Sequence, residues 1–360
     1  MNKFKEVLGM MKKISIFFLA LILIFSMAGC GAESDPQTSG PAGHVESEAD
    51  TEPADITGAD ETELPSDADT EDVTNDKEPT GEAGAFDLEQ GTVLLNSGYE
   101  MPILGIGCFR LSQEEAENSV YWALRDGYRL IDTARIYGNE AGVGRGIQRA
   151  IDEGFVTREE IFVTTKMWTD DYDDGAAAVD ASLDRLGLDY IDLMILHHSQ
   201  PENDVEAYQA MEQAVADGKL KSIGLSNYYE PEDFDRLVNA TTIVPALIQN
   251  ETHPYHQSME MKEHIAQYGT VMESWFPLGG RGNTQTLFND NTISSIAEAH
   301  GKTSAQVILR WHLQAGNIAI PGSSNEAHIQ ENFEIFDFEL SEEEMQRMTD
   351  IDKDQRFAGY

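Results

Sequence analysis

The sequence predicts an α/β fold, a closed (β/α)8 TIM barrel, for residues 91–360. Eight short apolar segments occur in order along these residues, and helical patterns separate them. Segments that are apolar throughout are typical of parallel strands covered on both faces by helices. The span of 270 residues also fits a barrel, whose usual size is about 250 residues. A doubly wound open sheet is the alternative fold.

The elements can be assigned one after another from helix and strand signals. Ser112 and Thr303 each begin a capping box, so we expect helices after them, the first ending near Gly127. Thr157–Glu160 has the same form directly before a strand. The eight expected strands are Leu104–Cys108, Arg129–Asp132, Ile161–Lys166, Ile191–His197, Ser222–Ser226, Ala246–Gln249, Val271–Trp275 and Ile318–Ile320.

Residues 1–30 have the features of an export signal. Their four lysines and one glutamate give a net charge of +3, and an apolar run of about 14 residues follows Lys13. This run is too short for an ordinary membrane span. The sequence from Met27 to Cys30 resembles the lipobox of bacterial lipoproteins, which implies that Cys30 is lipidated and anchors the chain to the extracytoplasmic face of the cell membrane. An ordinary signal peptide, or an uncleaved anchor with a chance cysteine, is the alternative.

Residues 31–90 are strongly acidic and are expected to form a disordered linker. They hold 19 acidic residues and a single lysine, a net charge of −18. Such a segment buries too little apolar surface to offset its conformational entropy. We interpret it as a spacer between anchor and barrel; an acidic recognition tail is the alternative.

Charge and cysteine content exclude several classes of protein. The whole chain has a net charge of −41, whereas nucleic-acid binding requires a basic surface. Two cysteines, Cys30 and Cys108, are too few for a disulfide framework or a cysteine-built zinc site. The acidic turn Asp170–Asp174 has Ser182 where a calcium loop needs its closing glutamate, so no metal site is expected.

Polar residues follow several of the predicted strands. Asp132, Lys166 and His197 stand at strand ends, and Tyr137 follows five residues after Asp132. In a (β/α)8 barrel the carboxyl ends of the strands form the rim that carries the chemistry. A carboxylate, a phenol, an ammonium and an imidazole are therefore expected to meet at one rim.

These motifs resemble those of the aldo-keto reductase superfamily. The resemblance covers nearly all of residues 91–360 and comprises motifs in the family's order. The opening Val93–Gly107 resembles the family's N-terminal β-hairpin, which implies a plug at the far end of the barrel. The other similar motifs are Leu130–Glu140, Val163–Trp168, Ile191–Pro201, Lys221–Tyr228, Ile248–Gln257, Ser274–Gly282 and Ile320–Asn332.

The resemblance implies NAD(P)H-dependent reduction of aldehydes and ketones by a catalytic tetrad. Tyr137 would protonate the carbonyl oxygen as general acid, and Lys166 would favour the phenolate by its charge. Asp132 would hold Lys166, while neutral His197 would align the carbonyl. The implied substrate-pocket residues are Phe109, Trp168 and His198, the last standing where the family usually has Trp.

The resemblance also implies the cofactor and its contacts. NADP(H) is the first expectation, with NAD(H) as the alternative, because Gly322 and His328 replace the family's usual lysine and arginine near the 2′-phosphate. Trp275 would stack on the nicotinamide ring. The implied cofactor residues are Ser226, Asn227, Gln249, Trp275, Leu278, Ser323, Glu331 and Asn332.

Two other functions stay open at this point. One is a membrane-tethered ligand-binding or sensory lipoprotein that keeps the barrel without turnover; the other is a surface scaffold with incidental enzyme competence. An exported chain would also have to obtain its nicotinamide cofactor outside the cytoplasm. Expected partners are a small carbonyl substrate, the dinucleotide and the membrane, and the family default is a monomer.

Overall fold

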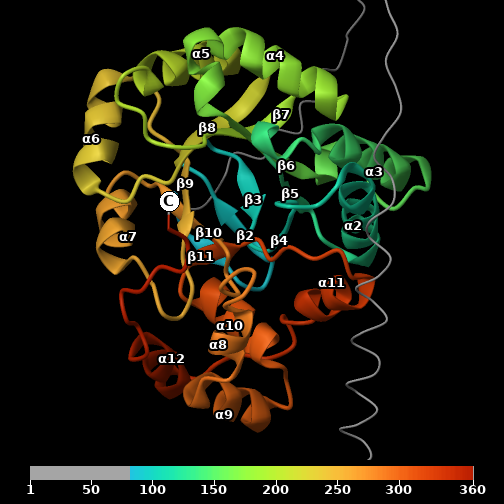
Figure 1. Cartoon of the computed structure of the whole chain (residues 1–360), viewed down its shortest axis with the longest axis vertical. Helices are drawn as coiled ribbons and strands as arrows, with labels where there is room; N and C mark the ends of the chain where they lie inside the picture. Colours follow the sequence, from blue (N-terminus) through green and yellow to red (C-terminus); the bar gives the residue numbers. More distant parts are fainter. Residues whose placement is uncertain (1–81, 360) are drawn as a thin grey trace, which may run out of the picture. The chain divides into compact units, whose positions relative to one another are not determined.

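The computed structural model describes residues 82–359, and within them eight parallel strands surround a common axis (Figure 1). The strands follow chain order around the sheet, and the first and last meet through a bridge between Leu104 and Ala319. The Gly107 N–H donates to the Pro321 carbonyl at 3.2 Å across the same seam. The predicted (β/α)8 barrel is thereby confirmed. Its strands are β4 (Gly105–Gly107), β5 (Leu130–Asp132), β6 (Phe162–Met167), β7 (Ile191–Leu196), β8 (Leu220–Ser226), β9 (Leu247–Glu251), β10 (Val271–Trp275) and β11 (Asn317–Ala319).

Helices cover the outside of this barrel in the described part of the chain (Figure 1). The Ser112 capping box is formed, and Gly127 ends that helix with φ 113°, a left-handed conformation that glycine adopts at low cost. The Thr303 box also starts a helix, whereas the Thr157 box caps only a 3-10 turn. The helices are α2 (Gln113–Asp126), α3 (Glu140–Asp152), α4 (Gly175–Leu186), α5 (Asp204–Ala216), α6 (Pro231–Ala240), α7 (Met259–Ala266), α8 (Thr284–Phe288), α9 (Asn291–His300), α10 (Ser304–Gln314), α11 (Glu326–Phe333) and α12 (Glu342–Thr349). The 3-10 turns are η1 (Arg135–Tyr137), η2 (Arg158–Glu160) and η3 (Thr169–Asp174).

A small antiparallel sheet precedes the barrel. Its strands are β1 (Phe86–Asp87), β2 (Thr92–Leu94) and β3 (Glu100–Pro102), and β2 and β3 form the expected hairpin. Strand β1 corrects the predicted domain boundary, because Phe86 pairs with Val93 inside what was expected to be linker. The Phe86 ring packs against the core, which gives this acidic stretch an apolar contact. The rest of the predicted linker, residues 31–81, and the signal segment 1–30 lie outside the described residues.

This small sheet contacts the amino-terminal ends of the barrel strands. The Asn96 amide donates to the Pro245 carbonyl at 3.1 Å, just before β9. The Ser97 and Ser222 hydroxyls are 2.7 Å apart near the start of β8. The sheet therefore lies at the end of the barrel opposite the carboxyl ends of its strands.

Helices long and apolar enough to cross a membrane are absent from residues 82–359.

Candidate active site

A buried ion pair joins the ends of β5 and β6. Lys166 is 0% exposed, and its Nζ lies 2.7 and 2.6 Å from the two carboxylate oxygens of Asp132. The same ammonium donates to the Thr133 carbonyl at 2.8 Å. Burial raises the pKa of Asp132, while the Lys166 charge acts in the opposite direction. Contact with both carboxylate oxygens is the geometry of an ion pair, so we describe Asp132 as the charged partner.

Tyr137 and His197 lie beside this ion pair. Tyr137 follows β5 on the turn η1, and the Lys166 Nζ is 5.0 Å from the centroid of its ring. The His197 ring directly follows β7 and lies 5.7 Å from the Tyr137 ring at an angle of 81°. Burial, together with the nearby Lys166 charge, lowers the pKa of His197 to about 2. The imidazole is therefore neutral at physiological pH, and its Nδ1 has no hydrogen-bond partner among the described residues. The structure thus brings all four tetrad residues to one rim.

Aromatic rings line this rim in a contiguous series. Phe109 lies 4.9 Å from the Tyr137 ring, and Trp168 lies 5.1 Å from the His197 ring. His198 stacks on His197 with centroids 5.1 Å apart and planes inclined by only 12°. The three predicted substrate-pocket residues are therefore neighbours of the tetrad.

Sequence reasoning missed Phe276 as a member of this aromatic series. Its ring lies 5.9 Å from Phe109 and 4.9 Å from Trp275. Its backbone φ of 53° is unusual for a bulky residue and turns the chain sharply after β10. The residue type does not predict this conformation. Only the position of Phe276 directly after Trp275 could have suggested that it lies at the rim.

Three of the predicted cofactor residues form a hydrogen-bonded group with Trp275. The Ser226 hydroxyl donates to the Gln249 carbonyl at 2.8 Å, and the Asn227 amide donates to the His197 carbonyl at 2.8 Å. The Trp275 indole N–H donates to the Asn227 side-chain oxygen at 3.2 Å. Asn227 is in the left-handed region with φ 60°, which asparagine tolerates better than most residues. A half-buried aromatic face beside amide and hydroxyl groups fits a nicotinamide ring and its carboxamide.

The remaining predicted cofactor residues come from two segments. Leu278 lies in the loop after β10, half-buried against the core. Ser323 lies between β11 and α11, and its hydroxyl accepts the Asn325 N–H at 3.0 Å. Glu331 and Asn332 lie on α11, where Asn332 is buried and Glu331 is partly exposed. The structure records no direct contact that joins these residues to the tetrad.

Gly322 and His328 occupy the two positions at which the family usually has a lysine and an arginine, and both follow β11 in the chain. Gly322 is exposed, but a Cβ added to it would lie 2.7 Å from the Gly107 carbonyl oxygen, so a side chain there requires backbone movement. His328 is exposed on the first turn of α11. Its neighbour Glu326 is held by Arg125 at 2.8 Å.

Beneath the rim, an amide links two buried carboxyl groups. The Gln249 Nε2 donates to Asp132 Oδ2 at 2.8 Å and to Glu273 Oε2 at 2.6 Å. Glu273 lies on β10 and is 0% exposed. Sequence reasoning did not select Glu273, because a single acid inside an apolar strand gives no signal that it faces the barrel interior.

The last described residues are held against the end of β9. The Glu251 carboxylate accepts backbone N–H groups from Phe357 at 2.5 Å and Ala358 at 3.2 Å. The Phe357 ring stacks on His253 with centroids 4.3 Å apart. The C-terminus accordingly lies near β9 in Figure 1.

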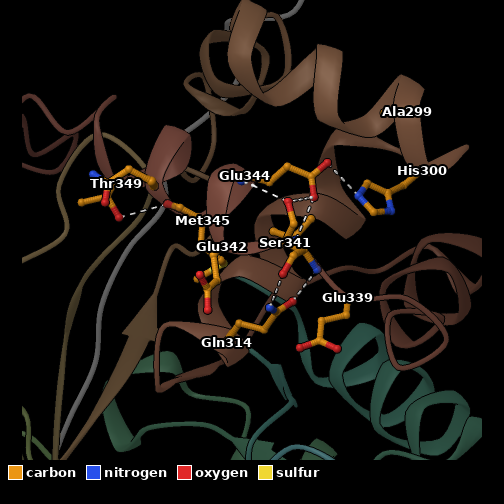
Figure 2. Close-up of a pocket in the computed structure, with 11 residues that line it drawn as sticks. Ala299, His300, Gln314, Glu339, Ser341, Glu342, Glu344, Met345 and Thr349 are labelled. Carbon is orange, nitrogen blue, oxygen red and sulfur yellow. Dashed lines mark hydrogen bonds and ion pairs between the residues drawn. The ribbon is translucent and has the colours of Figure 1, made fainter.

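A surface hollow among α9, α10 and α12 contains no predicted site residue (Figure 2). The His300 Nε2 lies 2.9 Å from a Glu344 oxygen, and the Gln314 amide bonds both backbone groups of Leu340 at 2.8 Å. Because the hollow holds none of the predicted site residues, we assign it no function. Residues 82–359 contain no cluster of three or more His, Cys, Asp or Glu side chains able to hold a metal ion.

Comparison with known proteins gives consistent results for this geometry. Residues 91–353 match the Aldo/keto reductase family. An aldo-keto reductase of Mycobacterium sp. (strain KMS) is 42% identical over 270 residues, covering 74% of this chain and 95% of the relative. The glyoxal reductase of Bacillus subtilis (strain 168) is 41% identical over 268 residues, covering 74% and 94%. The crystal structure of a Bombyx mori aldo-keto reductase in complex with NADP has a TM-score of 0.70 at 35% identity, covering 74% of this chain and 94% of that one.

Proposed function

The chain belongs to the aldo/keto reductase family, and from this membership we infer which of its side chains carry out the reaction. The protein is an NAD(P)H-dependent oxidoreductase that reduces aldehydes and ketones to alcohols by hydride transfer, with NADP(H) as cofactor. The ligand-binding or sensory alternative is not favoured, because the relatives are named reductases.

We propose that Tyr137 is the general acid of this reaction. When bound, the reduced nicotinamide supplies a hydride to the carbonyl carbon. The Tyr137 hydroxyl then gives its proton to the carbonyl oxygen, so that the product is a neutral alcohol. Lys166 stabilises the phenolate left behind, and Asp132 keeps Lys166 charged and in place. Neutral His197 donates a hydrogen bond that orients the carbonyl oxygen.

The observation that supports this assignment most is the position of Lys166. Its ammonium is anchored by Asp132 and lies 5.0 Å from the Tyr137 ring, inside a site from which bulk water is largely removed. In such a site the charge acts on the phenol more strongly than it would in water. The four side chains, which follow three successive strands, can therefore act together in a single reaction.

Turnover by the purified full chain with NADPH and a panel of carbonyls tests the assignment. We expect Tyr137→Phe to abolish reduction while cofactor binding stays nearly unchanged. Tyr99→Phe is the matched control, since Tyr99 is 43% exposed near the opposite end of the barrel. If Tyr137→Phe reduced carbonyls at the rate of the Tyr99→Phe control, Tyr137 would not be the general acid.

We propose that the cofactor's nicotinamide end is held by Ser226, Asn227 and Gln249, with Trp275 stacked on the ring. Leu278, Ser323, Glu331 and Asn332 are proposed contacts for the rest of the dinucleotide. The absence of lysine and arginine at Gly322 and His328 supports weak discrimination between NADP(H) and NAD(H). Phe109, Trp168 and His198 are proposed to contact the substrate.

We also propose that the enzyme is a monomeric lipoprotein tethered to the extracytoplasmic face of the membrane. The support is the sequence of residues 1–30, with lipidation at Cys30, followed by the acidic linker. We expect bacterial cells to hold the full chain in the membrane fraction and to release Cys30→Ala from it. Cys108→Ala is the control, because Cys108 is buried in the barrel. Light scattering of the purified protein tests the monomer.

A further inference from the structure

Glu273 is a fully buried acid that the proposed reaction does not use. It lies directly opposite Gln249 in the parallel pairing of β9 with β10. Its Oε2 accepts the Gln249 amide at 2.6 Å, and its Oε1 has no hydrogen-bond partner among the described residues. Buried polar atoms without partners are uncommon, so this carboxyl group calls for an explanation beyond packing.

Gln249 binds two carboxyl groups through one nitrogen, but among residues 82–359 Lys166 is the only cation that pairs with either of them. Asp132 holds the Lys166 ammonium at 2.6 Å, whereas Glu273 has only the neutral amide. Burial first, and the nearby Asp132 charge second, raise the pKa of Glu273 to about 8. The Glu273 carboxyl group is therefore mostly protonated at pH 7 and ionises at mildly alkaline pH.

The groups that surround Glu273 leave few other sources of charge. The charged groups that act on it are Asp132 on β5 and Lys166 on β6. Across the other edge of β10 its partner in the ladder is Ile318, which carries no charge. Cys108 lies near the same ion pair, but burial raises the pKa of its thiol, so it stays protonated.

Glu273 is also close to the proposed position of the nicotinamide. Side chains two residues apart on a strand point to the same face, so Glu273 and Trp275 share one face of β10. Because both hydrogen-bonded contacts of Gln249 Nε2 are carboxyl groups, its Oε1 is left as the acceptor for a carboxamide N–H. Glu273 therefore binds the nitrogen of the same Gln249 side chain whose oxygen is proposed to contact the cofactor.

We propose that Glu273 is a positioning residue that holds Gln249 and couples the charge of the bound nicotinamide ring to a proton on its own carboxyl group. This inference rests on the proposed function, in which Gln249 holds the carboxamide. The oxidised ring is cationic and the reduced ring is neutral. Loss of the Glu273 proton to solvent places a negative charge near the ring, which favours the oxidised form. By linkage, the oxidised cofactor must in turn favour release of that proton.

Calorimetry of cofactor binding to the full chain tests the coupling directly. Titration at pH 8 in two buffers of different ionisation enthalpy measures the protons released on binding. We expect NADP+ to release a substantial fraction of one proton and NADPH to release distinctly less. The 2′-phosphate is common to both ligands, so its own titration cancels in the difference.

The pH dependence of the two affinities gives a second measurement. We expect the ratio of Kd for NADPH to Kd for NADP+ to rise about tenfold from pH 6 to pH 9. A change of this size results if the positive charge of the oxidised ring lowers the pKa of the carboxyl group by about one unit. Glu273→Gln keeps an oxygen that can accept the Gln249 amide but removes the titrating proton, so in this variant the ratio should become independent of pH. Asp192→Asn is the control: Asp192 is also a buried strand acid, but it is paired with Arg158 and Lys221, and its loss should leave the ratio's rise intact.

The outcomes separate this inference from the proposed function. Equal proton release by both cofactors, or an unchanged rise of the ratio in Glu273→Gln, overturns the role of Glu273 while carbonyl reduction stands. Failure of the wild-type chain to reduce any carbonyl would instead overturn the proposed function. The proton-release measurement on the wild-type chain decides the matter even if Glu273→Gln does not fold.

Discussion

Replacement of Lys166 by methionine should affect stability and catalysis by separate mechanisms. The ammonium donates hydrogen bonds to both oxygens of Asp132 and to the Thr133 carbonyl, and it is 0% exposed. Lys166→Met removes these bonds and leaves the Asp132 carboxylate buried without its cation, while the Gln249 amide still donates to it. Breaking a buried ion pair from one side costs about 3–5 kcal/mol. We expect a loss of that size in the free energy of unfolding.

A second substitution should restore most of this stability. Asp132→Asn in the Lys166→Met background removes the uncompensated charge but keeps an oxygen for the Gln249 amide. Replacing both members of a buried pair is often close to neutral, so the double variant should be more stable than Lys166→Met by at least about 2 kcal/mol. Carbonyl reduction should stay absent in both, because neither has the ammonium beside Tyr137.

Urea unfolding measures the stability, provided that the m-values of the three proteins agree. Loss of NADPH absorbance with a carbonyl substrate measures the activity. A double variant no more stable than Lys166→Met would refute the description of Asp132 and Lys166 as a charged buried pair. Activity restored in the double variant would refute the catalytic use of the ammonium.

Two further predictions concern pH and cofactor choice. Burial lowers the pKa of His197 to about 2, below its unfolded value of 6.5, so the unfolded chain binds more protons and stability should fall as pH decreases below 6.5. His197→Gln should weaken this acid destabilisation in urea unfolding between pH 7 and pH 4, and an unchanged slope would contradict the reasoning. His328→Arg should strengthen NADPH binding by about tenfold through a charge-assisted contact with the 2′-phosphate, with NADH binding unchanged. Equal gains for both cofactors would show that residue 328 does not lie near that phosphate.

Strong local signals explain which parts of the fold were predictable. All eight strands are present, because segments such as Ile191–His197 are mostly apolar and are separated by helical patterns. Capping boxes marked helix starts correctly at Ser112 and Thr303. At Thr157 the same box produced one 3-10 turn, because the strand that begins at Phe162 leaves no room for a helix.

The features that sequence missed depend on contacts between distant residues. Phe86 stands in an acidic segment, and it becomes part of the fold through its pairing with Val93 and its packing against the core. Glu273 gains its importance from Gln249, which is adjacent in the sheet and 24 residues away in the chain. The tetrad could be predicted because its members follow strands whose ends must meet, and no comparable rule exists for a buried acid within a strand. The predictions for residues 1–81 lie outside the described part of the chain.

The position of the small amino-terminal sheet has a consequence for how substrates arrive. The described chain begins at residue 82 beside the amino-terminal ends of the strands, where Ala83 approaches Gly269. Tyr137 and His197 follow the opposite ends of the strands. The described chain therefore begins at the end of the barrel opposite the one that carries Tyr137 and His197, so residues 82 and 83 do not lie across the reactive opening. A small carbonyl compound can then reach this opening without passing the amino-terminal segment that the structure describes.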